Sequence, residues 1–207
     1  MSILGWVSDK LQRLRNAAMG RDKFQACVEI NNMLNDRILE GRGTSMSSLK
    51  LDTLSRKEWF LNYSRALFHN LVYLESSLCE IIKASREFIL VDMFHNTMTL
   101  AQISGFDLDD IDVKEIFILN ATFLISFNVE LSGIMTYYYY LTASSEDDIG
   151  WQWWDTDAGN KPNEEMWQSI RDRIREMFSA FSIICLKMGY DYDAMCENYI
   201  KTVSGEN

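Results

Sequence analysis

The sequence predicts an all-α protein, a helical bundle, and three observations support this. The 207 residues include one proline and ten glycines, so long stretches contain no residue that breaks a helix. Hydrophobic residues make up 47% of the chain and charged residues 24%, which is the balance of an ordinary folded protein. No segment shows the alternation of β-branched and polar residues between turn residues that would indicate a strand.

Two pairs of short motifs recur at one spacing. Asp92-Met-Phe94 is echoed by Glu176-Met-Phe178, and Gly105-Phe-Asp-Leu-Asp109 by Gly189-Tyr-Asp-Tyr-Asp193. Each pair is 84 residues apart, from 92 to 176 and from 105 to 189. A fixed offset indicates an internal repeat. We therefore expect one domain over residues 23–207, built from two tandem pseudo-repeats of about 23–111 and 112–207.

The helices of this bundle can be placed from apolar spacing and from helix-ending residues. An amphipathic, locally basic N-terminal helix is expected over 1–22, where it packs on the body of the subunit, or acts as a docking or dimerisation arm or as a membrane-surface helix. A Gly- and Ser-rich loop at 41–48 separates the first two helices of the domain. The expected helices of the domain cover residues 23–40, 55–78, about 86–104, 112–141, 164–188 and 193–203.

The charge, the cysteines and the apolar segments of the chain disfavour several classes of function. A net charge of −10 disfavours binding to nucleic acid or to an anionic membrane. The four cysteines show no CxxC spacing, which is typical of reduced thiols in a cytoplasmic protein. The apolar stretch 116–141 carries one charge, Glu130, but its Asn and Ser residues favour a buried central helix over a membrane span.

The order of motifs resembles that of a known family. The second half contains Phe127-Asn-Val-Glu-Leu131, Trp151-Gln-Trp-Trp154, Arg173-Ile-Arg-Glu-Met-Phe178, and Gly189 through Tyr199-Ile-Lys201. The first half contains Asn70-Leu-Val-Tyr-Leu74 and Ile89-Leu-Val-Asp-Met-Phe-His95. Over about residues 25–203 this resembles the all-α nucleoside triphosphate pyrophosphatases, namely the dimeric dUTPases, the phage dCTPase/dUTPases and the MazG-like proteins. The resemblance implies their fold, a phage-type protein and a possible homodimer.

The resemblance also implies a Mg²⁺ site made by acids three residues apart on two facing helices. Acids at that spacing share one helix face, and two such faces form an oxygen cage for the metal. The matching positions hold Phe127 and Glu130 on one expected helix, Arg173 and Glu176 on another, and Asn70, Tyr73, Ile89 and Asp92 in the first half. The candidate catalytic residues are therefore Glu130, Glu176 and Asp92, with Glu130 and Glu176 as metal ligands.

Several of the acids that the resemblance calls for are absent from this sequence, which predicts a degenerate member of the family. Phe127 and Ile89 cannot ligate a metal, and Arg173 places a cation where the metal charge belongs. Glu130, if buried in an apolar helix, needs a partner, which Arg173 or Arg175 could supply. The paired residues Asp92 and His95 could instead hydrogen-bond each other or a neighbouring helix.

A nucleotide site is also implied by the resemblance. Trp151, Trp153 and Trp154 stand in a polar insert, where they either close over a base or anchor a protein partner. Arg173 would meet phosphate, and His95 is a further nucleotide-binding candidate.

Three functions follow from these residues. The first is a pseudoenzyme that binds a nucleotide or a protein partner without efficient hydrolysis. The second is an active, Mg²⁺-dependent dUTP or dCTP pyrophosphohydrolase, which requires three or more carboxylates around one cavity. The third is an acidic inhibitor or a nucleic-acid-mimicking interaction protein, which requires the acids of 146–157 to form an exposed band and requires that there be no pocket.

Overall fold

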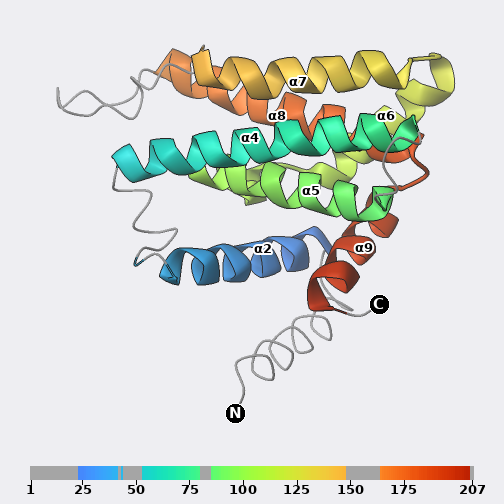
Figure 1. The fold of residues 1–207 in the computed structure, drawn as a ribbon. Helices are drawn as coiled ribbons and strands as arrows, with labels where there is room; N and C mark the ends of the chain where they lie inside the picture. Colours follow the sequence, from blue (N-terminus) through green and yellow to red (C-terminus); the bar gives the residue numbers. More distant parts are fainter. Residues whose placement is uncertain (1–22, 42, 44–52, 80–84, 148–163, 206–207) are drawn as a thin grey trace.

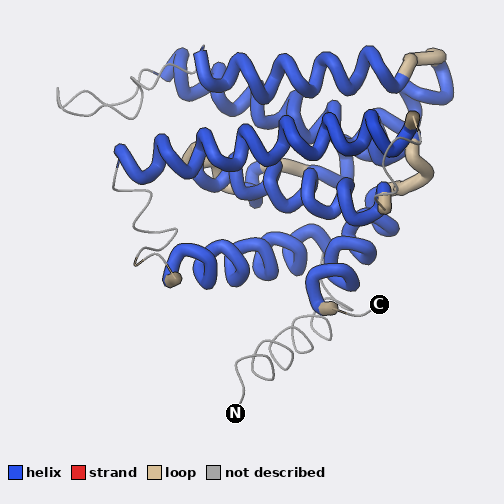
Figure 2. Tube along the Cα trace, viewed as in Figure 1, coloured by secondary structure: helices blue, strands red, loops and turns tan. Residues whose placement is uncertain are grey.

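The structure is a computed structural model that describes residues 23–41, 43, 53–79, 85–147 and 164–205. Within these ranges the chain forms seven α-helices and one short 3₁₀ helix, and no strand (Figure 2). The α-helices are α2 (Lys23–Glu40), α4 (Thr53–Leu78), α5 (Arg86–Ile103), α6 (Val113–Ser126), α7 (Leu131–Asp147), α8 (Glu164–Lys187) and α9 (Tyr192–Ser204), and the 3₁₀ helix is η1 (Leu108–Asp110). The predicted all-α class is confirmed.

The central helix α5 organises the bundle. In Figure 1, α7 and α8 form the upper layer, α4 and α5 lie below them, and α2 with α9 forms the lowest layer. α5 packs against α4, α2, α9 and α8, while α6 and α7 both pack against α8. Nearly every side chain of α5 from Ile89 onward is therefore buried. Such a helix is buried around its circumference instead of along one stripe.

Aromatic rings join the layers inside one hydrophobic core. Phe94 of α5 stacks on Phe181 of α8, with ring centroids 5.3 Å apart and planes 6° apart. The ring of Tyr199 meets Phe94 edge-on at 5.5 Å, and Phe24 of α2 lies 6.0 Å from Phe94. Offset and edge-on pairs of this kind add stability beyond the area they bury. Phe94 therefore links α2, α5, α8 and α9.

The two motif pairs occupy matching places: Asp92-Met-Phe94 and Glu176-Met-Phe178 lie within α5 and α8, and the glycine motifs follow the ends of these helices. Gly105 follows α5 with φ of 78°, and Gly189 follows α8 with φ of 88°, a backbone conformation that favours glycine. After each glycine an aspartate begins the next helix: Asp107 accepts a hydrogen bond from the amide of Asp109, and Asp191 from that of Ala194. The origin of the two halves as a repeat stays a prediction.

The predicted single helix over 112–141 is wrong. α6 ends at Ser126, Phe127 is extended with φ −130° and ψ 133°, and α7 starts at Leu131. Because the chain breaks between α6 and α7, both helices can pack on α8. The spacing of apolar residues along the sequence does not reveal this packing. Phe127 and Glu130 therefore do not share a helix face.

Other predicted elements agree with the structure or lie outside its description. The helix predicted over 23–40 is confirmed as α2, and those over 164–188 and 193–203 match α8 and α9 to within one residue. Of the described helices, none combines the length and hydropathy that crossing a bilayer requires. The N-terminal helix over 1–22, the tryptophan insert and most of the acidic segment 146–157 lie outside the described residues.

Candidate functional site

The predicted acidic site begins with Glu130, which is exposed in the segment between α6 and α7. The expectation of a buried Glu130 paired with an arginine rested on an unbroken apolar helix, and it is wrong. An exposed carboxylate is solvated by water and needs no protein partner.

Glu176 and Arg173 lie on α8, and both influence the pKa of Tyr137 on α7. Burial raises the pKa of Tyr137, the charge and hydrogen bonding of Glu176 raise it further, and Arg173 opposes them. Tyr137 and Glu176 line a small cavity of about 290 Å³ between α7 and α8. The other residues that line it are uncharged: Val129, Gly133, Ile134, Ser179, Ala180 and Ile183. Of the described residues that line this cavity, Glu176 is thus the single one with a carboxylate.

The third predicted acid, Asp92, lies on α5, where burial raises its pKa. Among the residues that the structure describes, no three His, Cys, Asp or Glu side chains are grouped so that they could hold a metal ion. Mg²⁺ binding by protein requires several oxygen ligands around one point. The described carboxylates do not provide such a set, and we derive no hydrolytic step from them.

His95 lies in a buried polar network that joins four helices. Its Nδ1 is 3.0 Å from Asn31 Nδ2 of α2 and 3.0 Å from the Tyr199 hydroxyl of α9. Asn31 also donates to Thr99 Oγ1 at 3.1 Å and to the backbone oxygen of His95 at 3.1 Å. Asn35 Nδ2 donates to Thr99 Oγ1 at 2.9 Å. His95 is therefore bonded to neighbouring helices, and the alternative of a bond to Asp92 does not appear in this network.

The network reaches α4 through Tyr63, whose hydroxyl donates to Asn35 Oδ1 at 2.9 Å. Asn31, Asn35 and Thr99 are fully buried, with none of their surface exposed. Burial lowers the pKa of His95 to about 4, so its ring is neutral at pH 7. Buried polar groups are stable when they satisfy one another in this way. Sequence reasoning found His95 but missed its partners, although two asparagines four residues apart, on the face of α2 that carries its buried apolar residues, were a usable signal.

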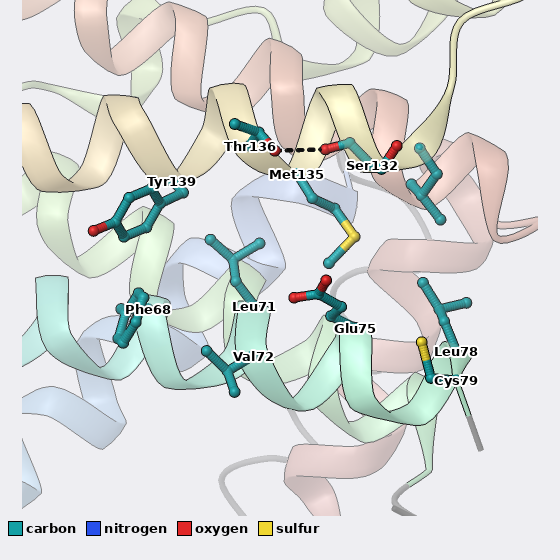
Figure 3. Close-up of a pocket in the computed structure, with 11 residues that line it drawn as sticks. Phe68, Leu71, Val72, Glu75, Leu78, Cys79, Ser132, Met135, Thr136 and Tyr139 are labelled. Atoms are coloured by element: carbon teal, nitrogen blue, oxygen red, sulfur yellow. Dashed lines mark hydrogen bonds between the residues drawn. The ribbon is translucent and has the colours of Figure 1, made fainter. Parts of the chain in front are cut away.

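An apolar groove lies between α4 and α7, as Figure 3 shows. Its volume is about 440 Å³. We define the α4–α7 groove by the residues that line it: Phe68, Leu71, Val72, Glu75, Leu78 and Cys79 of α4, and Leu131, Ser132, Met135, Thr136 and Tyr139 of α7. Sequence reasoning missed this groove because nothing along the chain brings residues 68–79 next to 131–139.

The groove has an apolar floor and partly exposed apolar walls. Leu71 and Met135 are buried at its base, whereas Phe68, Val72 and Tyr139 are each 40% exposed or slightly more. The rings of Phe68 and Tyr139 lie 5.2 Å apart and connect the two walls. These partly exposed side chains retain apolar surface that a bound molecule could cover.

The groove contains few polar groups that could bind a ligand. Among the described residues that line it, Glu75 is the single charged one, and Figure 3 shows its carboxylate close to Met135. The Thr136 hydroxyl donates to the backbone oxygen of Ser132 at 2.8 Å, so its donor is already used. The groove therefore combines apolar contact with one negative charge, which suits binding and offers no base–nucleophile pair.

Comparison with known protein families, with curated proteins and with solved structures found no match. The relation to the all-α pyrophosphatases therefore stays a prediction from the sequence motifs.

Proposed function

We propose that this protein is a non-catalytic binding protein whose α4–α7 groove receives the apolar face of a helix from a protein partner. The observation that carries the proposal is the groove itself, with buried Leu71 and Met135 at its floor and exposed Val72 on its wall. Amphipathic helices bind in apolar grooves of this kind through residues spaced three and four apart.

The dimensions of the groove favour a helix over a small molecule. Its α4 wall runs from Phe68 to Cys79, which at 1.5 Å per residue is a length of roughly 16 Å. That length accommodates about three turns of a partner helix. A small ligand would need several polar groups to orient it, and Glu75 is the only charged one present.

Glu75 specifies the chemistry of the partner. A helix that fills the groove with leucine or similar side chains and carries a lysine or arginine opposite Glu75 would satisfy both features. The net charge of −10 also speeds the approach of a basic partner and slows that of an acidic one.

The motifs led us to expect a degenerate relative of the pyrophosphatases that binds either a nucleotide or a protein partner. The function proposed here is the second of these two alternatives, binding of a protein partner. The nucleotide-binding form depends on Trp151, Trp153 and Trp154, which lie outside the described residues. The active-enzyme form finds no support in the positions of Glu130, Glu176 and Asp92, because these carboxylates form no metal-binding group.

The test is a fluorescence-anisotropy titration with a labelled model peptide of about 18 residues. The peptide has leucines on one helical face and a single central lysine. Val72→Glu places a charge in the groove and should weaken binding at least tenfold. The matched control is Ile38→Glu, which introduces the same charge at an exposed isoleucine of α2, outside the groove, and should leave binding unchanged.

A charge swap makes the test specific for Glu75. Glu75→Lys should weaken binding of the lysine peptide by a few-fold and strengthen binding of a matching glutamate peptide, as for a partly exposed ion pair. Equal binding by wild type and Val72→Glu would refute the groove as the site. Calorimetric titration with dNTPs and Mg²⁺ tests the alternative that the protein is an active enzyme, because heat from turnover would contradict a non-catalytic role.

A further inference from the structure

The helix α6 presents an unusual amount of apolar surface to solvent. Its exposed large side chains, with their exposed fractions, are Ile118 (57%), Leu119 (60%), Phe123 (40%), Ile125 (88%) and, at its end, Phe127 (59%). We call these five residues the α6 face. Single exposed apolar residues are normal on a soluble protein, but five within ten positions form a patch that marks an interaction site.

The opposite side of α6 is fixed to the bundle, so the α6 face is presented rigidly. Phe117 and Val113 are buried. Asn120 Nδ2 donates to Ser182 Oγ at 2.6 Å and to Ser179 Oγ at 3.0 Å, which clamps α6 to α8. The rings of Phe123 and Phe127 stack 4.9 Å apart. A face already held in one arrangement loses little conformational freedom when a partner covers it.

The charge pattern indicates what that partner is. Residues 116–129 contain no Asp, Glu, Lys or Arg, in a chain with a net charge of −10. Two copies of an acidic protein repel each other least where both surfaces are uncharged. A basic partner, by contrast, would find no opposite charge on this face.

We propose that the α6 face is the interface between two copies of this chain, with α6 packed antiparallel against α6 of the second copy. The same face then serves both subunits, as two-fold symmetry requires. Thr122 lies at the middle of the stretch 118–127, so the two-fold axis passes close to it. The antiparallel arrangement places the N-terminus of each helix near the C-terminus of the other, which is favourable for their dipoles.

The available area is sufficient for a dimer. The exposed portions of the five side chains amount to apolar area on the order of 600 Å² per subunit, from the usual size of such side chains. A standard interface buries about 800 Å² per partner, of which a little over half is apolar. The α6 face alone therefore supplies the apolar core of such an interface, separately from the α4–α7 groove.

Sedimentation equilibrium of the full-length chain tests the proposal. Wild type should sediment at twice the 24.1 kDa chain mass. Ile125→Asp should reduce the mass to that of one chain, and because Ile125 is 88% exposed the fold, checked by circular dichroism, should be retained. The control Ile38→Asp alters an isoleucine of α2 that is 47% exposed and should leave the dimer intact. A wild type that stays monomeric at about 100 μM, or an Ile125→Asp variant that stays dimeric, overturns the proposal.

Cross-linking tests the position of the axis. In a Cys79→Ser background, which removes the exposed native thiol, Thr122→Cys should form a disulfide-linked dimer on mild oxidation. Cys79→Ser alone should not. A dimer that sediments as such but does not cross-link at Thr122→Cys contradicts the antiparallel arrangement about that residue.

Discussion

The hydroxyl of Tyr199 lies 3.0 Å from Nδ1 of His95 and joins the last helix of the chain to the central one. Asn31 Nδ2 reaches the same nitrogen at 3.0 Å. Asn31 Nδ2 is a donor and can bond to Nδ1 only while that nitrogen carries no proton, so the neutral ring with an unprotonated Nδ1 is the form that keeps this bond. The lowered pKa of His95, about 4, has burial as its cause.

This arrangement predicts acid-sensitive stability. The pKa of His95 is about 6.5 in the unfolded chain and about 4 in the folded one, so between these values the unfolded chain binds more protons. Stability should therefore be fully present above pH 6.5 and should fall as the pH drops toward 4. The loss attributable to His95 is roughly 3 kcal/mol at most, from 1.36 kcal/mol per pKa unit. Urea unfolding at pH 7, 6 and 5 measures it.

The variant His95→Asn isolates this effect from the protonation of carboxylates. It keeps a hydrogen-bonding side chain and removes the titration, so its stability should change less between pH 7 and pH 5 than that of wild type. His69→Asn, at an exposed position of α4, should retain the wild-type pH dependence. An unchanged pH dependence in His95→Asn would rule out His95 as the source.

Cys79 should be the fast-reacting thiol of the folded protein. It is exposed at the end of α4, whereas Cys27, Cys185 and Cys196 are buried, and burial raises the pKa of the Cys185 thiol. Thiol reactivity requires access and the thiolate form. An Ellman titration should show one equivalent reacting quickly in native protein and four in denaturant.

Cys79→Ser provides the control for that titration and should remove the fast phase. Because Cys79 lines the α4–α7 groove, its modification with a bulky maleimide should also block the leucine peptide. Two or more fast equivalents in native protein would show that the described burial of the other thiols does not hold in solution.

Gln102 carries a buried oxygen without a hydrogen-bond partner, and its side chain is 8% exposed on α5. Leaving a polar group buried and unpaired costs about 1–3 kcal/mol. Gln102→Met preserves the shape of the side chain and removes this acceptor, so we expect the free energy of unfolding to rise by about 1 kcal/mol. Urea unfolding at pH 7 measures the change.

Gln25→Met is the matched control, because Gln25 already donates a hydrogen bond to Asp109. That substitution should not stabilise the protein. A loss of stability in Gln102→Met would mean that the oxygen of Gln102 has a favourable role that the structure does not reveal.

Local information in the sequence predicted most helices. Gly105 and Gly189 mark the ends of α5 and α8, because each adopts a positive φ that other residues rarely accept. The spacing of apolar residues located α2, α8 and α9 to within one residue. The break at Phe127 was missed, since both α6 and α7 are apolar and their separation depends on how each packs against α8.

The sequence by itself determined the helical class and the ends of most helices, because these depend on side chains and backbone conformations that are neighbours along the chain. Only the tertiary structure decided which residues meet. It brought Asn31, His95 and Tyr199 together from three helices, exposed Glu130, and made Val72 of α4 and Met135 of α7 line the same groove. The physical reason is that burial and hydrogen bonding depend on neighbours far apart in sequence, which a single chain's local pattern does not specify.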